Sequence, residues 1–204
     1  MATTVGIGKS AMKSEVETWI EGAGEKFLKD IGIKSGQRIL DFGCGSGNYA
    51  IPAAKIVGEE GLVYALDKDK RSLDQLMRKA ESMNLKNIIR LDISNESGTG
   101  LDDESLDVVL LYDVLHHYYF PRAEARRQLL RESYRILRPS GLLSFYPTHL
   151  QSYMEPTLDD VEREIQEANF YLECEYSGTL VVHDNNLEKG QVMNFRKGNK
   201  RTGC

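Results

Sequence analysis

The stretch Ile39–Ala50, ILDFGCGSGNYA, places Gly43, Gly45 and Gly47 directly after a short apolar run that contains Asp41. Glycines at such a point let the backbone approach a ligand at the carboxyl end of a buried strand. The spacing is G-x-G-x-G, whereas a dinucleotide-binding turn has G-x-G-x-x-G and a P-loop closes with Gly-Lys before Ser or Thr. Asp41 would repel a pyrophosphate and attract an ammonium group. The stretch therefore predicts a site for a nucleoside that carries a positive charge.

Two more acidic residues follow the next two apolar runs. Asp67, in VYALDKD, lies about 20 residues beyond the glycines, where a carboxylate can accept hydrogen bonds from both ribose hydroxyls. Asp92, in RLDIS, is placed to accept a hydrogen bond from an adenine amino group, with Ile93 against the ring. Each acid alone is also a common turn residue. Their shared position at strand ends favours a nucleoside that bears an amine.

Apolar runs alternate with helical patterns from residue 38 to about residue 170. Runs rich in Ile, Leu and Val, bounded by Gly, Asp or Asn, are typical of strands buried on both faces. The alternation predicts an α/β fold, doubly wound, with a mostly parallel sheet. The expected strands are Arg38–Asp41, Leu62–Leu66, Asn87–Leu91, Leu106–Leu111 and Leu142–Tyr146.

The two ends of the chain depart from this alternation. FYLECEYSGTLVVHD and QVMNFR are joined by NNLEKG, which is too short for a crossover helix, so these runs are expected to form an antiparallel hairpin. The first 30 residues have an amphipathic helical pattern around Trp19 and Phe27 and are expected to pack over one edge of the sheet. The predicted organisation is a helical segment 1–30, a domain 31–197 and a tail 198–204.

Composition limits the kinds of partner. With 26 basic and 31 acidic residues the net charge is −5, which argues against nucleic acid as the main partner. Three cysteines without a CxxC pair indicate neither a zinc site nor a disulfide framework, and no metal is predicted. The first residues lack the apolar core of a signal peptide, and no apolar run approaches ~20 residues. A cytoplasmic protein without a membrane partner is expected.

The chain resembles the class I S-adenosylmethionine-dependent methyltransferases, especially the small "type 11" group, over roughly residues 30–197. DFGCGSG matches the first motif of that family, ALDKD the acid that holds the ribose, and RLDIS the adenine-side motif. GLDDESLDVVLLYDVLHHY and LLRESYRILRPSGLLSFY resemble its fourth and fifth strand regions, and VEREIQEANF the helix before the last two strands. The resemblance implies a Rossmann-like fold with an antiparallel ending and S-adenosylmethionine as the cofactor.

The same resemblance implies where the cofactor lies. Asp41 would face the methionine amino group, directly or through water, and the glycine loop would lie under the cofactor. Cys44 occupies a variable position of the motif, and a small buried apolar residue is its alternative role. The predicted cofactor-binding residues are Asp41, Gly43, Cys44, Gly45, Gly47, Asp67, Lys68, Asp92, Ile93 and Tyr112.

Methyl transfer from a sulfonium is an in-line displacement that needs no metal and no covalent enzyme intermediate. Alignment of the reactants carries most of it, with a base where the nucleophile bears a proton. The candidate bases follow the fourth and fifth strands and are His117, His116 and His149. Helix entry and packing are the alternative role of the two adjacent histidines.

The acceptor is narrowed by the residues directly after the fourth and fifth strands. YDVL stands where enzymes that methylate exocyclic base nitrogens have Asn/Asp-Pro-Pro-aromatic, and PTH stands where metal-dependent catechol-type enzymes have Asp-Asn. A small-molecule acceptor is expected by analogy of fold. A non-catalytic S-adenosylmethionine-binding regulator and a protein or RNA methyltransferase remain open. Only PTHLQSYMEP occupies the usual place of a substrate cap, so the N-terminal residues or a second subunit, in a homodimer, would enclose the site.

Overall fold

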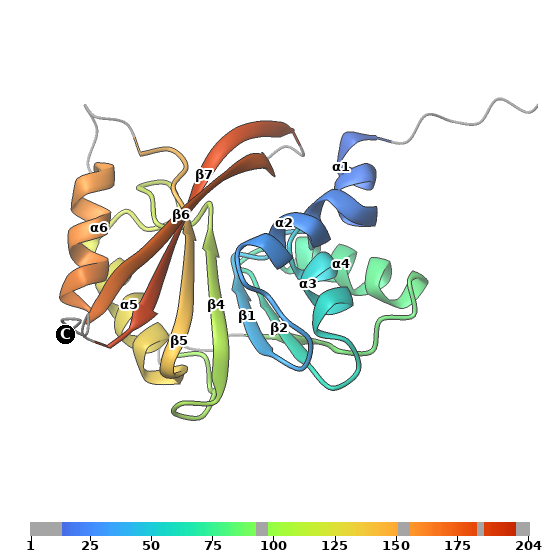
Figure 1. Ribbon diagram of the computed structural model, residues 1–204, viewed down its shortest axis with the longest axis horizontal. Helices are drawn as coiled ribbons and strands as arrows, with labels where there is room; N and C mark the ends of the chain where they lie inside the picture. Colours follow the sequence, from blue (N-terminus) through green and yellow to red (C-terminus); the bar gives the residue numbers. More distant parts are fainter. Residues whose placement is uncertain (1–13, 93–97, 151–155, 183–185, 199–204) are drawn as a thin grey trace, which may run out of the picture.

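The computed structural model describes residues 14–92, 98–150, 156–182 and 186–198. These residues form one sheet of seven strands in the order β3-β2-β1-β4-β5-β7-β6, with helices on both faces (Figure 1). The strands are β1 (Arg38–Phe42), β2 (Leu62–Leu66), β3 (Ile88–Leu91), β4 (Leu106–Tyr112), β5 (Leu137–Tyr146), β6 (Phe170–Val181) and β7 (Leu187–Lys197).

The sheet has the predicted mixture of directions. Strands β1 to β5 pair in parallel, and β7 pairs antiparallel with both β5 and β6. The α/β class, the mostly parallel sheet and the antiparallel hairpin are therefore confirmed. Strand β5 begins five positions before the predicted Leu142, because Leu137 already pairs with Leu106. A register shift and a positive φ of 61° at Ser140 absorb the Pro-Ser-Gly turn inside the strand.

Each face of the sheet buries its own apolar cluster. Alternate strand residues point to opposite faces, so Ile39 packs with α3 (Ala50–Val57) and α4 (Lys70–Ser82), whereas Leu40 packs with α5 (Ala123–Ile136) and α6 (Leu158–Glu167). This arrangement places the carboxyl ends of the parallel strands together on one side of the molecule, called here the carboxyl edge, where the loops that follow the strands meet. Among the helices of the described ranges, none combines the length and the apolar character that crossing a bilayer requires.

The N-terminal helices lie on one face of the sheet and reach its edge strand β6. They are α1 (Glu15–Thr18), the π-helical η1 (Trp19–Ala23) and α2 (Gly24–Asp30), drawn in blue beside α3 in Figure 1. Trp19 Nε1 donates a hydrogen bond of 2.8 Å to the Asn48 carbonyl at the start of α3. The Phe27 ring packs against Gly178 of β6. Burial of these two aromatic rings fixes the helices against α3 and the edge strand β6.

Candidate functional site

The loop between β1 and α3 has the backbone conformation that the three glycines predict. Gly43, Gly45 and Gly47 have φ values of 80°, 51° and 93°. A Cβ on Gly43 would overlap Cγ1 of Val114, and one on Gly47 would overlap Cδ1 of Leu76. A Cβ on Gly45 would meet no atom within 4 Å. The loop is therefore packed against the protein at two glycines and presents its backbone outward at the third.

Asp67 holds this loop from the end of the neighbouring strand. Its Oδ2 accepts a hydrogen bond of 2.8 Å from the Gly45 N–H, and its Oδ1 accepts one of 2.8 Å from the Asp69 N–H. The next residue, Lys68, places its Nζ 4.0 Å from the centre of the Tyr119 ring. The loops after β1, β2 and β4 are therefore connected at the carboxyl edge of the sheet.

Asp41 is a buried carboxylate with an incomplete set of partners. Its side chain is 2% exposed, and its Oδ2 has no hydrogen-bond partner among the residues that the structure describes. Burial, and then the negative charge of Asp67, raise the pKa of Asp41 to about 7 despite a hydrogen bond from the Ala50 N–H. A buried acceptor without a donor is costly, and a cationic ligand beside it would remove that cost. The site therefore fits a bound ammonium group.

Two buried tyrosines, Tyr112 and Tyr49, lie near the carboxylate of Asp41. The Tyr112 hydroxyl shares a hydrogen bond of 2.8 Å with Ser144 Oγ, and burial, offset in part by that bond and reinforced by Asp41, raises the pKa of Tyr112. The Tyr112 ring packs edge-on against Tyr49 at 4.6 Å between ring centres. Tyr49 donates a hydrogen bond of 2.8 Å to the Val181 carbonyl. The sequence analysis missed Tyr49, although its place at the end of the glycine loop was a signal.

The remaining cofactor candidates differ in their surroundings. Cys44 is buried, and burial raises the pKa of its thiol well above the usual value, so it has the properties of a small apolar residue rather than a nucleophile. Asp92 is exposed and forms a salt bridge of 2.9 Å with Arg90. Ile93 lies outside the described residues.

Beyond β4 and β5 the structure brings together Asp113, His116, Thr148 and His149, called here the Asp113 group. Thr148 donates a short hydrogen bond to Oδ1 of Asp113, and the Nε2 atoms of His116 and His149 lie 3.4 and 3.5 Å from the same oxygen. The two imidazole rings are 5.0 Å apart. Burial would raise the pKa of Asp113, but the hydrogen bonds from His116 and Thr148 outweigh burial and lower it.

The three candidate bases occupy different environments. His116 is buried, donates through Nε2 to the Asp113 carbonyl at 3.0 Å, and accepts the Tyr119 N–H at Nδ1 at 3.3 Å. His149 has a side chain that is 31% exposed. His117 is exposed, and within the ranges that the structure covers it forms no ion pair with Asp113. The central position of Asp113 was not predicted from the sequence.

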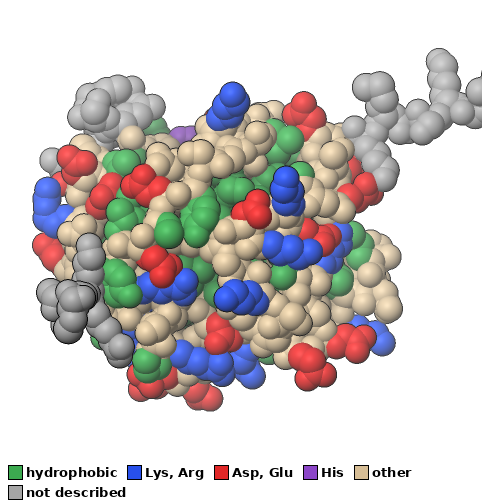
Figure 2. All heavy atoms as spheres, viewed as in Figure 1, with side chains coloured by type: hydrophobic (Ala, Val, Ile, Leu, Met, Phe, Trp, Pro, Cys, Tyr) green, Lys and Arg blue, Asp and Glu red, His purple; other side chains and the backbone are tan. Residues whose placement is uncertain are grey.

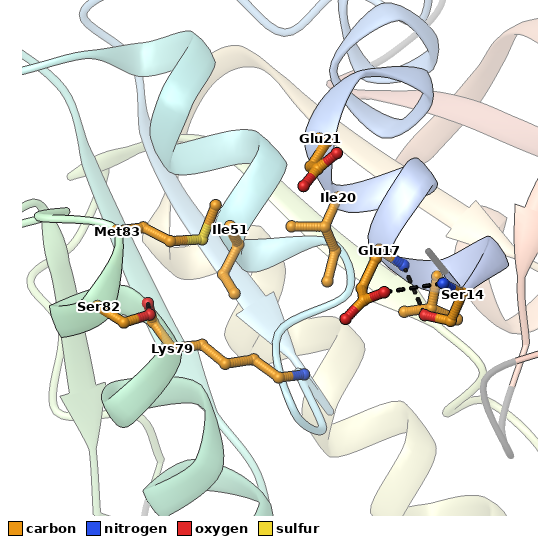
Figure 3. A pocket seen from close by; sticks show the side chains of 9 residues that line it. Ser14, Glu17, Ile20, Glu21, Ile51, Lys79, Ser82 and Met83 are labelled. Carbon is orange, nitrogen blue, oxygen red and sulfur yellow. Dashed lines mark hydrogen bonds between the residues drawn. The ribbon is translucent and has the colours of Figure 1, made fainter. Parts of the chain in front are cut away.

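A pocket of about 520 Å³ lies between the N-terminal helices and the helices α3 and α4 (Figure 3). Lys79 extends into it and donates weak hydrogen bonds of 3.3 and 3.4 Å to Ser46 of the loop. None of the predicted cofactor or catalytic residues lines this pocket, so it is separate from the carboxyl-edge site. The pocket is lined by Ser14, Val16, Glu17, Ile20, Glu21, Ile51, Lys79, Ser82 and Met83.

In the part of the chain that the structure describes, no cluster of three His, Cys, Asp or Glu side chains is suited to a metal ion.

The chain is similar in sequence to known methyltransferases. A demethylmenaquinone methyltransferase of Lactobacillus johnsonii is 34% identical over 124 residues, which are 61% of this chain and 49% of that protein. A probable cobalt-precorrin-6B C(15)-methyltransferase of Saccharolobus solfataricus is 38% identical over 64 residues, which are 31% of this chain and 32% of that protein. The chain thus spans about half or less of the length of these curated relatives.

The fold has solved counterparts. The crystal structure of a SAM-dependent methyltransferase from Methanosarcina mazei aligns with a TM-score of 0.67 at 16% identity, covering 85% of this chain and 98% of that one. The family model described as a methyltransferase domain matches residues 40–145, from β1 to the end of β5, which is more than half of the chain. The resemblance noted in the sequence is confirmed, and the family match indicates S-adenosylmethionine as the cofactor. The chain belongs to the methyltransferase domain family.

Proposed function

We propose that this protein transfers a methyl group from S-adenosylmethionine, in line and without a metal, to a small-molecule acceptor. The observation that carries the proposal is Asp41, a buried carboxylate with one oxygen unpartnered, beside a glycine loop that Asp67 holds open. That carboxylate would repel an anionic ligand, and a cationic hydrogen-bond donor would gain more from it than a neutral one. The family match over residues 40–145 supports the same assignment.

Each residue of the site then has a distinct task. Asp41 accepts a hydrogen bond from the methionine ammonium group, Asp67 accepts from the ribose hydroxyls, and Asp92 accepts from the adenine amine. The outward backbone of Gly45 permits close approach under the ligand. When bound, S-adenosylmethionine supplies a methyl group that its sulfonium already activates.

Further contacts hold the site in place before any ligand arrives. Because the carboxylate of Asp67 also accepts the Gly45 N–H, the ribose contact and the loop are organised together. Tyr112 and Tyr49, both buried, close the site on the side of Asp41 and exclude water there. The ammonium end of the cofactor would therefore lie in a dry, preformed setting, and alignment of the two reactants is the main source of rate in such a displacement.

A small-molecule acceptor is supported by two observations. The relatives described above are named for demethylmenaquinone and cobalt-precorrin-6B, which are small molecules. On the face drawn in Figure 2, basic and acidic side chains are interspersed rather than gathered by sign. Such a face lacks the basic footprint that binds nucleic acid. The homodimer and the cytoplasmic location expected from the sequence stay predictions.

Calorimetric titration with S-adenosylmethionine, S-adenosylhomocysteine and NAD in parallel tests the cofactor. Binding of the first two and not of NAD is expected, and it should disappear in Asp41→Ala but persist in Asp103→Asn, an exposed acid that pairs with Arg135. Binding of NAD alone, or of none of the three, would contradict the proposal. Release of S-adenosylhomocysteine in the presence of candidate acceptors then tests transfer. A protein that binds the cofactor but releases none with any small molecule would favour a regulator or a macromolecular acceptor.

A further inference from the structure

We propose that Arg90 is a positioning residue for the cofactor, which fixes the carboxylate of Asp92 so that one oxygen stays open to the exocyclic amino group of the purine. Arg90 thereby favours an adenine nucleoside over one that carries a carbonyl at the same place. This role rests on the proposed function, which assigns Asp92 to the adenine amine.

Strand β3 brings Arg90 and Asp92 to one face of the sheet. Side chains two positions apart along a strand point to the same face, and Ile88 of β3 is buried in the cluster that α3 and α4 cover. Arg90 therefore faces α4, and Asp92 follows on the same face directly after the strand ends. A charged side chain of α4 can meet both residues there.

The position of Asp92 places it beside the proposed ribose contact. Strands β2 and β3 are parallel and pair Leu66 with Leu91. Asp67 and Asp92 are thus the next residues of two neighbouring strands, at the carboxyl edge. A nucleoside whose ribose binds Asp67 has its base within reach of Asp92.

The guanidinium group of Arg90 joins two carboxylates. Its Nε donates a hydrogen bond of 2.9 Å to Oδ1 of Asp92, and its Nη2 lies 2.9 Å from the same oxygen. Its Nη1 donates a short hydrogen bond to Oδ1 of Asp74 on α4. The planar group is therefore held at both ends, with one edge on Asp92. A lysine has a single ammonium group and could not hold both contacts in so fixed a geometry.

Both contacts of Arg90 with Asp92 are made by one carboxylate oxygen. Among the residues that the structure describes, none donates a hydrogen bond to Oδ2 of Asp92. The side chain of Asp92 is 61% exposed, whereas that of Arg90 is 24% exposed. Asp92 thus has one oxygen engaged by the protein and the other available to a ligand.

The available oxygen determines which purine fits. An ionised carboxylate only accepts hydrogen bonds. Adenine carries an exocyclic amino group, which donates, where hypoxanthine carries a carbonyl, which would face Oδ2 with no hydrogen between the two oxygens. An unpaired polar contact of this kind discriminates more strongly than a small loss of apolar area. An exposed aspartate that rotates freely would discriminate less, and Arg90 removes that freedom.

A contribution to stability alone does not account for the arrangement. Ion pairs between exposed side chains contribute little to folding, and Asp74 and Asp92 are 52% and 61% exposed. We therefore expect Arg90→Met to shift the melting temperature by less than about 3 °C. The effect should appear in ligand selection instead.

Calorimetry with S-adenosylhomocysteine and S-inosylhomocysteine tests this selection. The wild type should bind the adenine compound at least about tenfold more tightly. Arg90→Met should lower this ratio of affinities by about fivefold or more, and Arg90→Lys should recover it only in part. Arg78→Met replaces an exposed arginine of α4 that forms no ion pair among the described residues, and it should leave the ratio unchanged.

A double-mutant cycle separates positioning of Asp92 from a direct contact of Arg90 with the base. The amide of Asp92→Asn can turn to suit either purine, so the ratio should be near one, and Arg90→Met should change it no further. An arginine that touched the base itself would, when removed, weaken both compounds equally and leave the wild-type ratio. That result would overturn the proposal, as would an effect of Arg90→Met that persists undiminished in Asp92→Asn.

The contact between Arg90 and Asp92 can be measured without any ligand. The Nε–H signal of Arg90 in ¹H–¹⁵N spectra, assigned with Arg90→Lys, should shift in Asp92→Asn and stay in place in Asp103→Asn. An unchanged signal in Asp92→Asn would overturn the contact and the proposal with it. A wild type that bound neither compound would overturn the proposed function as well, whereas tight binding with equal ratios in wild type and Arg90→Met would overturn the role of Arg90 alone.

Discussion

The buried carboxylate of Asp41 makes both stability and ligand binding depend on pH. In the folded protein burial and Asp67 raise its pKa from the usual 3.8 to about 7. The folded state therefore keeps a proton that the unfolded chain loses near pH 4. The stabilisation associated with this proton is complete below that pH and is lost as the pH rises through about 7.

The size of the effect follows from the difference in pKa. A rise from 3.8 to about 7 corresponds to about 4 kcal/mol of unfolding free energy. Between pH 4 and pH 7 the wild type should lose about this much stability relative to Asp41→Asn, whose amide cannot ionise. Comparison of the two proteins isolates Asp41 from the other carboxyl groups, which titrate in both. Denaturant unfolding at pH 4, 5, 6, 7 and 8 measures the difference.

Ligand binding should show the reverse dependence. An ammonium group beside Asp41 favours the ionised carboxylate, so binding at pH 6 must expel about 0.9 proton, and affinity should be about eightfold lower at pH 6.0 than at pH 7.5. Calorimetry with S-adenosylhomocysteine, in two buffers of different ionisation enthalpy, counts the protons released. Release of no proton by the wild type at pH 6 would refute the reasoning, as would an affinity that is flat over this range.

Three other substitutions test separate parts of the structure. Asp67→Ala should abolish binding of S-adenosylhomocysteine, as measured by calorimetry. It should also lower the free energy of unfolding by about 1–3 kcal/mol, because the carboxylate accepts two backbone N–H groups. Unchanged affinity would contradict the assignment of Asp67 to the cofactor site. Gly43→Ala should destabilise the protein, because the new Cβ overlaps Val114. In the double mutant, Val114→Ala should restore part of the lost stability. If the two changes in melting temperature simply add, that overlap is not the cause. Glu164→Gln should lower the free energy of unfolding, measured with denaturant, by about 3–5 kcal/mol. The reason is that Arg126, which is 5% exposed, loses the negative charge of the carboxylate that accepts two of its hydrogen bonds. A loss below about 1 kcal/mol would mean that water compensates for the missing charge.

Strand positions could be predicted from the sequence because their signals are local. Leu62–Leu66 was predicted with its observed bounds, since an apolar run between Gly61 and Asp67 has one interpretation in a parallel sheet. The start of β5 could not be predicted, because the Pro-Ser-Gly turn normally ends a strand and only pairing with Leu106 carries the strand through it. The place of the N-terminal helices depended on contacts with β6, more than 140 residues away in the chain, and no local pattern reports such contacts.

The same distinction applies to the site. The glycine loop and Asp67 follow a motif that is continuous in sequence, and the structure joins them through the hydrogen bond between Asp67 and Gly45. The Asp113 group has no such motif, since Thr148 and His149 come from a loop 35 residues further along. Sequence reasoning could name the histidines by residue type, but only the pairing of β4 with β5 places His149 beside Asp113.

The β6–β7 hairpin has a structural role in a chain with so short a cap. It continues beyond its pairing with β5, because β7 meets β5 only through Met193–Arg196 while its earlier residues pair with β6 alone. Tyr49 donates to the Val181 carbonyl on this extension, and Trp19 donates to the Asn48 carbonyl on the glycine loop. The hairpin, the N-terminal helices and the start of α3 are therefore tied together around the side of the site that holds Asp41. These hydrogen bonds hold that side together, whereas the loop after β4, with exposed Tyr118, is open to solvent. Such a division is what the proposed function requires, with the cofactor bound on the Asp41 side and the acceptor bound by the residues after β4 and β5.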